Sequence, residues 1–443
     1  MRKIALPTIF ILTLMAAPAH MLSAVPINIR WTYTWPTDTH LSRASGDLHF
    51  AGETILLQSH EGPDVDPVIA VETRTGRVQY QRGPYASMRT VFGDEKFLAP
   101  VGSHIRAFAT RDGRDLGVVS AWTERTRILA RDAQDAFYIF SDGQLLCTAP
   151  GNNPTIVWSV TIERSCPGAR EYDTTVDSIN GRLYLTYGGA QSGLCALNRG
   201  TGALLWNYTS IYRDNMDIRR RVLATPSHIV LAETGGPTSR SVGMITMMDF
   251  ADGRVLASYP AQGSIGLSLD DRERVVFGDY SGRIFNADLK AGRGIWYYSS
   301  FNLATGDIYP DDISMQVSLL STDAERVYFV AELTNQNELV ALDRENGNTL
   351  WRFRPQDLRA AHVHAAPEEA RTVTLNGIVY SFWSNHRRAQ HMLIGVDAHT
   401  GKEVGRSAPI PDLQVDEPHG PYLHDGALYA LIHNRLVSFA PLR

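Results

Sequence analysis

The sequence predicts an all-β protein: a β-propeller of four-stranded blades, closed into a ring by a strand from the N-terminal part of the chain. Three observations predict this fold: a turn phrase that recurs along the chain, paired strand-like segments upstream of each phrase, and an orphan strand near the N-terminus. The 36 Gly and 22 Pro residues supply the many tight turns that such a fold needs.

The recurring phrase is an apolar strand, an acidic or amide residue, a turn that ends in Gly, and an aromatic residue near the start of the next strand. Clear copies occupy 69–80, 195–206, 340–351 and 394–401. The Asp or Asn side chain can accept hydrogen bonds from amides within the turn, and Gly takes the positive φ that closes the hairpin. The aromatic ring is large enough to fill the wedge between adjacent sheets. The residues expected in these roles are Gly76, Gly202, Trp206, Asp343, Gly347, Trp351, Asp397 and Gly401.

The number of blades follows from counting the turn glycines. Eight of them recur about 37 to 55 residues apart, at Gly76, Gly113, Gly151, Gly202, Gly253, Gly292, Gly347 and Gly401. The tail adds three strands without a fourth, and the orphan strand at 29–33, with Trp31, completes that last blade. Direct counting therefore predicts nine blades. Eight would be the ordinary number, in which case Gly113 or Gly151 is miscounted.

The N-terminus has the pattern of a secretory signal peptide. Arg2 and Lys3 precede an apolar stretch at 4–17, and the small residues at 17–19 favour cleavage after Ala19, with Ala24 as the latest alternative. An uncleaved membrane anchor is the competing interpretation. We expect residues 1–19 to be the signal peptide, residues 27–443 to form a single propeller domain, and the mature chain to be secreted or periplasmic with no membrane span.

The charge and cysteine content narrow the function further. A formal net charge of −5 gives no basic field, so nucleic acid is not expected as a partner. The three cysteines allow at most one internal disulfide. A Cys166–Cys195 bridge is one alternative. The other leaves Cys166 free in its loop, with Cys147 and Cys195 as buried, inert thiols in apolar strands.

The phrases that end at Trp206 and Trp351 resemble the tryptophan-docking repeat of the PQQ-like, quinoprotein alcohol dehydrogenase-like, propeller superfamily. The resemblance spans nearly all of the chain after the signal peptide, with degenerate copies in about half of the repeats. It implies the propeller architecture. In style it is closest to the propeller lipoprotein of outer-membrane protein assembly, and it implies scaffold work of that kind. No lipidation cysteine follows the apolar stretch, which departs from that lipoprotein.

Enzymatic activity is the rival interpretation: a quinoprotein-type dehydrogenase, with PQQ and calcium, or a metal-dependent enzyme, in either case with its site in the central funnel. The resemblance implies an adjacent cysteine pair for many such enzymes, and no two cysteines are adjacent here. No metalloprotease helix motif, nucleophile elbow or phosphate-binding glycine loop is present either. No cofactor is therefore predicted, and the expected function is non-catalytic.

Charged or titratable residues lead into several innermost strands, where they would face the central channel. We expect a funnel-mouth ligand site from these side chains, with solvated loops as the alternative. Its candidate residues are Arg127, Asp173, Arg220, Asp312, His364 and His419. His362 and His364, one residue apart on a strand, would also place two imidazoles on one face as a weakly specific metal pair.

The favoured function is thus an exported propeller, a monomer or a component of a complex, that offers a rigid surface to a protein or peptide partner. Outer edge strands could accept an added strand, and loops on the faces could dock a partner. The longer insertions at 234–241 and 302–314 are the best candidate binding loops.

Overall fold

The computed structural model describes most of the chain after residue 24. The described residues are 25–35, 48–58, 65–86, 90–162, 166, 175–187, 193–210, 218–225, 227–235, 242–262, 264–269, 274–279, 283–288, 291, 293–299, 317–333, 336–355, 372–385, 390–411, 418–432 and 434–443. Their 37 secondary-structure elements are all β-strands. Among these residues, no helix is long and apolar enough to cross a membrane. The predicted signal peptide lies outside them.

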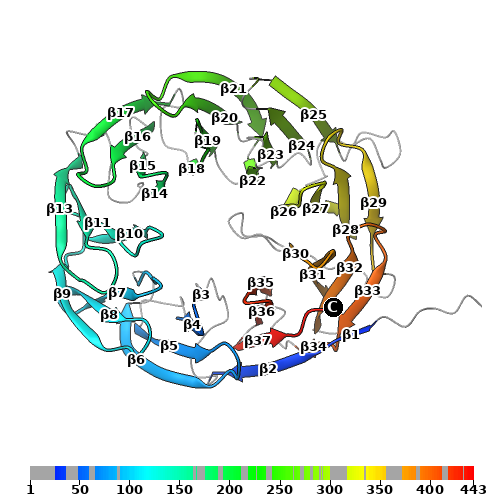
Figure 1. Cartoon of the computed structure of the whole chain (residues 1–443), viewed down its shortest axis with the longest axis horizontal. Helices are drawn as coiled ribbons and strands as arrows, with labels where there is room; N and C mark the ends of the chain where they lie inside the picture. Colours follow the sequence, from blue (N-terminus) through cyan, green and yellow to red (C-terminus); the bar gives the residue numbers. More distant parts are fainter. Residues whose placement is uncertain are drawn as a thin grey trace, which may run out of the picture.

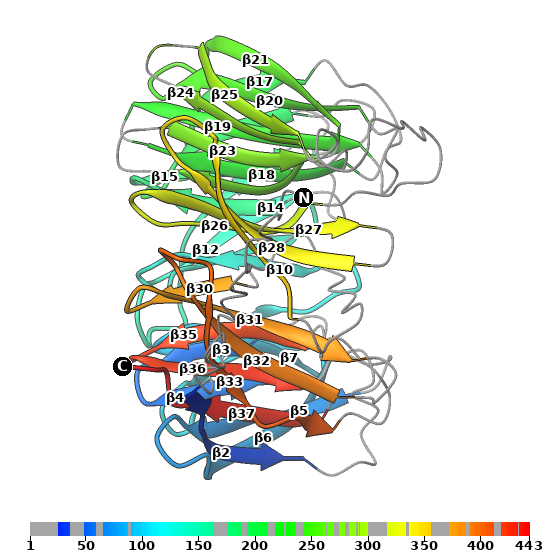
Figure 2. The same ribbon diagram turned by 90° about the vertical axis from the view of Figure 1, so that its right-hand side faces the viewer.

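The described strands form nine sheets arranged as blades around a ring, as direct counting of the repeats predicted (Figure 1). Within each blade the first strand lies nearest the centre and the last lies on the circumference. Figure 2 shows the same ring from its rim. The turns at Gly113 and Gly151, the weaker repeats, each connect two strands of a genuine blade.

The first four blades follow one another along the chain. Blade 1 contains β3 (Leu48–Ala51), β4 (Thr54–Leu57), β5 (Val65–Glu72) and β6 (Val78–Ala86). Blade 2 contains a bridge from Val91 to Leu98, then β7 (Lys96–Val101), β8 (His104–Ala109) and β9 (Asp115–Ala121). Blade 3 contains β10 (Arg127–Arg131), β11 (Phe137–Ser141), β12 (Gln144–Thr148) and β13 (Ile156–Thr161). Blade 4 contains β14 (Thr175–Ile179), β15 (Arg182–Tyr187), β16 (Gly193–Asn198) and β17 (Leu204–Thr209).

The next four blades repeat this order. Blade 5 contains β18 (Ile218–Ala224), β19 (His228–Gly235), β20 (Val242–Asp249) and β21 (Val255–Gln262). Blade 6 contains β22 (Ser264–Leu269), β23 (Arg274–Asp279), β24 (Arg283–Asp288) and β25 (Arg293–Ser299). Blade 7 contains β26 (Val317–Thr322), β27 (Arg326–Leu333), β28 (Gln336–Asp343) and β29 (Thr349–Phe353). Blade 8 contains β30 (Thr372–Leu375), β31 (Ile378–Asn385), β32 (Gln390–Asp397) and β33 (Glu403–Ser407).

The N-terminal segment closes the ring, as the orphan strand predicted. Blade 9 contains β35 (His419–His424), β36 (Ala427–Ile432) and β37 (Arg435–Phe439), and its outer strand is β2 (Ile29–Thr34), antiparallel to β37. A shorter strand, β1 (Val25–Ile27), pairs in parallel with β33 on the outside of blade 8, and β34 (Ile410–Pro411) pairs with β32. The sequence did not predict β1.

The core of the propeller lies between the blades. The buried apolar residues fall into nine clusters, and each described cluster joins two neighbouring blades. Alternating side chains on the middle strands supply both faces of every sheet, which is why these strands carry apolar residues on both faces. The cluster between blades 9 and 1 includes Trp35 and Tyr429, so closure of the ring is itself an apolar contact.

Tryptophan or tyrosine rings tie six of these interfaces together. Each ring stands on the outer strand of one blade, and its N–H or O–H donates to a carbonyl of the third-to-fourth-strand turn in the next blade. The donor–acceptor pairs are Trp31–Thr73, Tyr80–Thr110, Trp158–Arg199, Trp206–Phe250, Trp296–Arg344 and Trp351–Ala398. The ring covers the turn glycine, where a Cβ would collide with it.

A one-residue β-bulge lies directly before the docked ring, or before the equivalent residue in the blades that have no such ring. In all nine described outer strands the register against the neighbouring strand skips this residue, which we call the bulge residue. The nine bulge residues are Arg30, Gln79, Leu116, Val157, Leu205, Leu256, Ile295, Leu350 and Val404. The residue after each is called the docking position. A bulge bends its strand and increases the local twist, which re-aims the following side chain.

Two requirements make residue 401 a glycine: its φ is +69°, and an added Cβ would lie 2.6 Å from Trp351 Cγ. We expect Gly401→Ala to destabilise the fold by at least about 1 kcal/mol more than Gly377→Ala. Gly377, in the same blade, has a φ of +72° but open space around it, so its variant carries the backbone strain alone. Urea unfolding of both variants measures the difference. Equal losses in the free energy of unfolding would mean that the Trp351 ring can pack over a turn residue that has a Cβ.

The cysteines adopt the first of the two predicted alternatives. Cys166 and Cys195 form a disulfide with a sequence separation of 29, which ties β16 to the segment after β13. Cys147 is the free cysteine of the described chain, and it is buried. The alternative in which Cys166 is free to reach a partner and Cys195 is an inert thiol is therefore wrong, because both sulfurs are buried and joined.

Candidate functional site: a polar network across four blades

Three of the residues expected at the funnel mouth lie on innermost strands (Figure 1). Arg127 begins β10, His419 begins β35, and Arg220 is the third residue of β18. The side chain of Arg220 lies outside the described part of the structure, as do the residues Asp173, Asp312, His362 and His364. The guanidinium of Arg127 donates to the carbonyls of Glu124 and Thr126, each at 2.9 Å. A ligand-binding role for the funnel residues stays a prediction.

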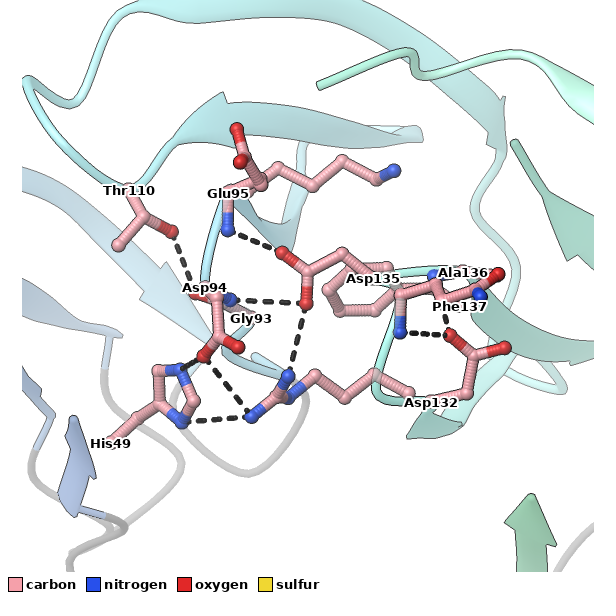
Figure 3. A network of polar contacts seen from close by, with 12 residues as sticks. His49, Gly93, Asp94, Glu95, Thr110, Asp132, Asp135, Ala136 and Phe137 are labelled. Atoms are coloured by element: carbon pink, nitrogen blue, oxygen red, sulfur yellow. Dashed lines mark hydrogen bonds and ion pairs between the residues drawn. The ribbon is translucent and has the colours of Figure 1, made fainter. Parts of the chain in front are cut away.

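A polar network that sequence reasoning did not single out joins blades 1, 2 and 3 where their first and second strands connect. Figure 3 shows it: His49 comes from β3, Asp94 precedes β7, and Asp135 lies in the turn between β10 and β11. Asp135 has a φ of +59°, a left-handed conformation that Asp tolerates better than most residues. The turn thus holds the carboxylate where it can reach blade 2.

Asp135 is the centre of the network. Its side chain is 2% exposed, and Oδ1 accepts from the backbone N–H of Asp94 and from Nη1 of Arg131, both at 3.0 Å. Oδ2 accepts from the N–H of Glu95. Gly93 has to be glycine here, because a Cβ would lie 2.7 Å from Oδ1 of Asp135. The buried carboxylate therefore satisfies two amides of the neighbouring blade and one cation of its own.

His49 completes the network from blade 1. Its Nε2 lies 2.9 Å from Oδ1 of Asp94, and its Nδ1 lies 3.4 Å from Nη2 of Arg131. Because a guanidinium can only donate, Nδ1 is the acceptor and Nε2–H donates to the carboxylate. Burial and the nearby Arg131 lower the pKa of His49, against the opposing effect of Asp94. The imidazole is therefore neutral at pH 7 and serves to orient its partners.

Lys96 joins blades 2 and 3, an interface outside the six that a docked tryptophan or tyrosine ring ties together. The docking position of β9 is Gly117, and no atom lies within 4 Å of a Cβ built on Gly151 in the next blade. Instead Lys96, fully buried, donates from Nζ to the carbonyls of Ala149 at 2.7 Å and Asn153 at 3.1 Å, and also to that of Gly151. A buried ammonium group thus satisfies the turn that a tryptophan covers elsewhere.

The stability of the protein is expected to depend on pH through Lys96. Burial lowers the pKa of its ammonium group to about 8, although neighbouring carboxylates oppose the shift. Between pH 8 and the ordinary lysine range, the unfolded chain holds this proton and the folded chain does not, so stability rises with pH in that window. The free energy of unfolding of the wild type, minus that of Lys96→Met, should therefore increase from pH 8 to pH 10. A flat or falling difference would contradict the shift.

Asp132 extends the network to blade 4. Its Oδ2 accepts from the hydroxyl of Tyr138 at 2.8 Å and from Nε of Arg199 at 2.7 Å, and Oδ1 accepts from the amides of Gln134 and Ala136. Burial, with a smaller contribution from Asp132, raises the pKa of Cys147 to about 12. That thiol is therefore protonated at neutral pH and is not prepared to act as a nucleophile.

The arrangement is suited to holding blades together. Its carboxylates are matched by amides, a guanidinium or an imidazole of the protein itself, which is what buried polar groups require for stability. Within the described part of the chain, no three His, Cys, Asp or Glu side chains come together as a set of metal ligands. One feature of the sequence could have pointed to part of the network. An Asp before the second strand and a Tyr within it occur in two blades, and they form the hydrogen-bonded pairs Asp132–Tyr138 in blade 3 and Asp323–Tyr328, at 2.6 Å, in blade 7.

One family model matches the sequence over more than half of its length. A family model described as outer membrane protein assembly factor BamB matches residues 101–296 and, in a second overlapping match, residues 243–408. None of the curated proteins matches the sequence significantly.

Among solved structures, BamB from Moraxella catarrhalis is 12% identical, with a TM-score of 0.49, over 94% of this chain and 100% of that one. Quinohemoprotein alcohol dehydrogenase from Comamonas testosteroni is 14% identical, with a TM-score of 0.47, over 80% of this chain and 74% of that one.

Proposed function

Because the chain belongs to the family whose model is described as outer membrane protein assembly factor BamB, we propose that it is a protein-binding scaffold that acts in the assembly of outer-membrane proteins. The proposal places the protein outside the cytoplasm, which its N-terminal targeting pattern supports: Arg2 and Lys3 precede an apolar stretch and small residues. The scaffold is non-catalytic, and its partner is a protein or a peptide.

One observation carries the proposal: the apolar surface that the described residues expose is concentrated on the circumference of the ring. Thirteen large apolar side chains are exposed: eleven stand on the outer strand of a blade, Val25 stands on the added strand β1, and Leu423 stands on the inner strand β35. Contiguous exposed apolar surface marks sites of protein contact in soluble proteins. The polar network of blades 1 to 4, by contrast, is matched internally and contributes rigidity.

The experiment removes the gene from its native cell and measures the folded fraction of β-barrel outer-membrane proteins. We expect this fraction to fall and to recover when the full-length chain is returned. Purified protein incubated with PQQ and calcium should neither retain the cofactor on dialysis nor oxidise alcohols or sugars with a dye acceptor. Unchanged barrel levels, together with cofactor-dependent oxidation, would overturn the scaffold function in favour of a dehydrogenase.

A further inference from the structure

Three adjacent outer strands contain no charged residue. They are β13, β17 and β21, in blades 3, 4 and 5, with the sequences IVWSVT, LLWNYT and VLASYPAQ. We call these three strands the uncharged arc, and they lie next to one another on the circumference (Figure 1). Every other outer strand carries at least one charge, at Arg30, Arg82, Asp115, Arg293, Arg352, Glu403 or Arg406.

The free edges of these strands are the second observation. Within the described residues, each strand of the uncharged arc pairs only with the third strand of its own blade, so its outward backbone groups have no strand partner. Natural proteins usually protect such an edge with charged side chains, because an unprotected edge invites another strand to pair with it. The bulge in each strand disrupts the ladder at one residue and leaves the strand beyond it regular.

Apolar side chains are exposed along the same three strands. The bulge residues Val157, Leu205 and Leu256 are 55%, 44% and 37% exposed. Leu204 and Val255, close by, are exposed to a similar degree. In blade 8, by contrast, the bulge residue Val404 is partly buried against the core cluster that includes Ile27 of β1. The same position of the repeat is thus covered where a strand has been added and open on the uncharged arc.

Blade 8 shows how an outer edge of this propeller accepts a strand. β1 pairs in parallel with β33, with Val25 opposite Gly405, Pro26 opposite Arg406 and Ile27 opposite Ser407. This pairing begins at the docking position, directly after the bulge. Ile27 is 2% exposed, so one side chain of the added strand is anchored while Val25, two residues away, faces solvent at 55%. The equivalent stretches of the uncharged arc begin at Trp158, Trp206 and Ala257.

We propose that the uncharged arc binds an extended segment of a partner protein, with apolar side chains at alternate positions, by adding it as a strand in the manner of β1. The inference rests on the proposed scaffold function and names the site and the kind of segment. Alternation is required because side chains of an added strand point to opposite faces, and one face meets the exposed apolar residues. Unfolded strands of outer-membrane barrels have this alternation. Three equivalent edges in a row would also hold a long unfolded chain by multivalency.

An extended segment fits the arc better than a second copy of this chain. Two copies meeting edge to edge would bring two bulged strands together, and each bulge would interrupt the ladder of the other. A flexible segment can begin its pairing after the bulge, as β1 does. A second copy therefore becomes an outcome of the test, detected as a dimer by sedimentation.

The test uses a soluble fluorescein-labelled peptide in which Val and Thr alternate between terminal lysines, with fluorescence anisotropy as the readout. The variant Ser159→Lys, Asn207→Lys, Ser258→Lys charges the exposed residue after the docking position on each strand of the arc. We expect it to weaken binding by about ten-fold or more. The matched control, Thr32→Lys with Gln81→Lys, makes the same change at the same position of β2 and β6, and it should bind within about two-fold of wild type.

Two further readouts identify strand addition as the mode of binding. Hydrogen exchange should slow at amides of β13, β17 and β21 when the peptide binds, and should be unchanged at β2 and β6. A peptide with N-methylated valines lacks the donors that a strand needs and should not bind. Equal weakening in the two lysine variants, binding of the N-methylated peptide, absence of peptide binding to the wild type, or blockage of the arc by dimerisation would each overturn the proposal. A chain that restores barrel levels in cells without binding the peptide would overturn the arc site alone and leave the scaffold function standing.

Discussion

Trp351→Ala is expected to lower the free energy of unfolding by about 3–5 kcal/mol, the usual cost of removing a large buried aromatic side chain. Trp351 is 8% exposed and packs in the apolar cluster between blades 7 and 8. Its indole N–H donates to the carbonyl of Ala398 at 2.8 Å, and its ring covers Gly401. Truncation therefore opens a cavity and leaves a buried carbonyl without its donor. Urea unfolding followed by far-ultraviolet circular dichroism measures the loss.

The neighbouring residue provides the control. Leu350 is the bulge residue of the same strand and is 46% exposed, so Leu350→Ala should change stability by no more than about 0.5 kcal/mol. Trp351→Phe keeps most of the apolar contact and loses the hydrogen bond, which should cost about 1 kcal/mol plus a smaller packing term. If Trp351→Ala were no more harmful than Leu350→Ala, tryptophan docking would not be what joins these blades.

Asp135→Ala is expected to cost about 3–4 kcal/mol, because it leaves two backbone N–H groups of blade 2 without an acceptor and places alanine in a left-handed conformation. The side chain it removes is 2% exposed, and it also pairs with Arg131. Since the contacts cross from blade 3 to blade 2, the loss should appear as faster hydrogen exchange at the amides of Asp94 and Glu95. Thermal or urea unfolding gives the size of the effect.

Asp94 serves as the comparison for this prediction. Its carboxylate is 55% exposed and pairs with His49 and Arg131 at the rim of the network. An exposed ion pair contributes little to stability, so Asp94→Ala should cost less than about 1 kcal/mol. Asp135→Asn retains one acceptor oxygen and tolerance for the left-handed conformation, and it should fall between the two alanine variants. A loss as large for Asp94 as for Asp135 would show that burial does not decide the contribution.

The propeller could be predicted because the residues that define its repeat lie close together in the sequence. The turn glycine and the aromatic residue of one phrase lie a few positions apart, as in Gly202 and Trp206. The glycine is required by the positive φ of the turn, and the aromatic residue by the size of the space between two blades. The closing strand was recognisable for the same reason, since Trp31 supplies the aromatic residue that the last blade lacks. Nine copies of a weak signal therefore outweigh the degeneracy of any one.

The bulges and β1 could not be read from the sequence. A bulge residue such as Leu205 resembles any other apolar residue of a strand, because the extra residue becomes visible only against the register of the partner strand. β1 is only three residues long and begins at Val25, two residues before the predicted start of the domain. Its pairing partner β33 is distant in sequence, so no local pattern of residues predicts that β1 is a strand.

The polar network was missed for a related reason. His49 meets Asp94 across 45 residues and Arg131 across 82, and single charged residues at such separations look like ordinary solvated turns. The predicted funnel site depended on placing charges at the start of inner strands, and Arg127 and His419 do begin such strands. Position alone does not determine whether a side chain faces a ligand, and Arg127 donates to carbonyls of its own loop.

The closure of the ring by β2 sets an order of events during biosynthesis. The segment that is synthesised first finds its partner, β37, only when the last residues of the chain are available; Asn434, at the other end, donates to the carbonyl of Trp35 across 399 residues. Until then the growing chain is an open arc with an unpaired edge at each end. A product that terminates before Arg435 lacks β37, so β2 has no partner, and the unpaired strand edges favour aggregation. The N-terminal strand thus makes closure of the ring depend on the last strand of the chain.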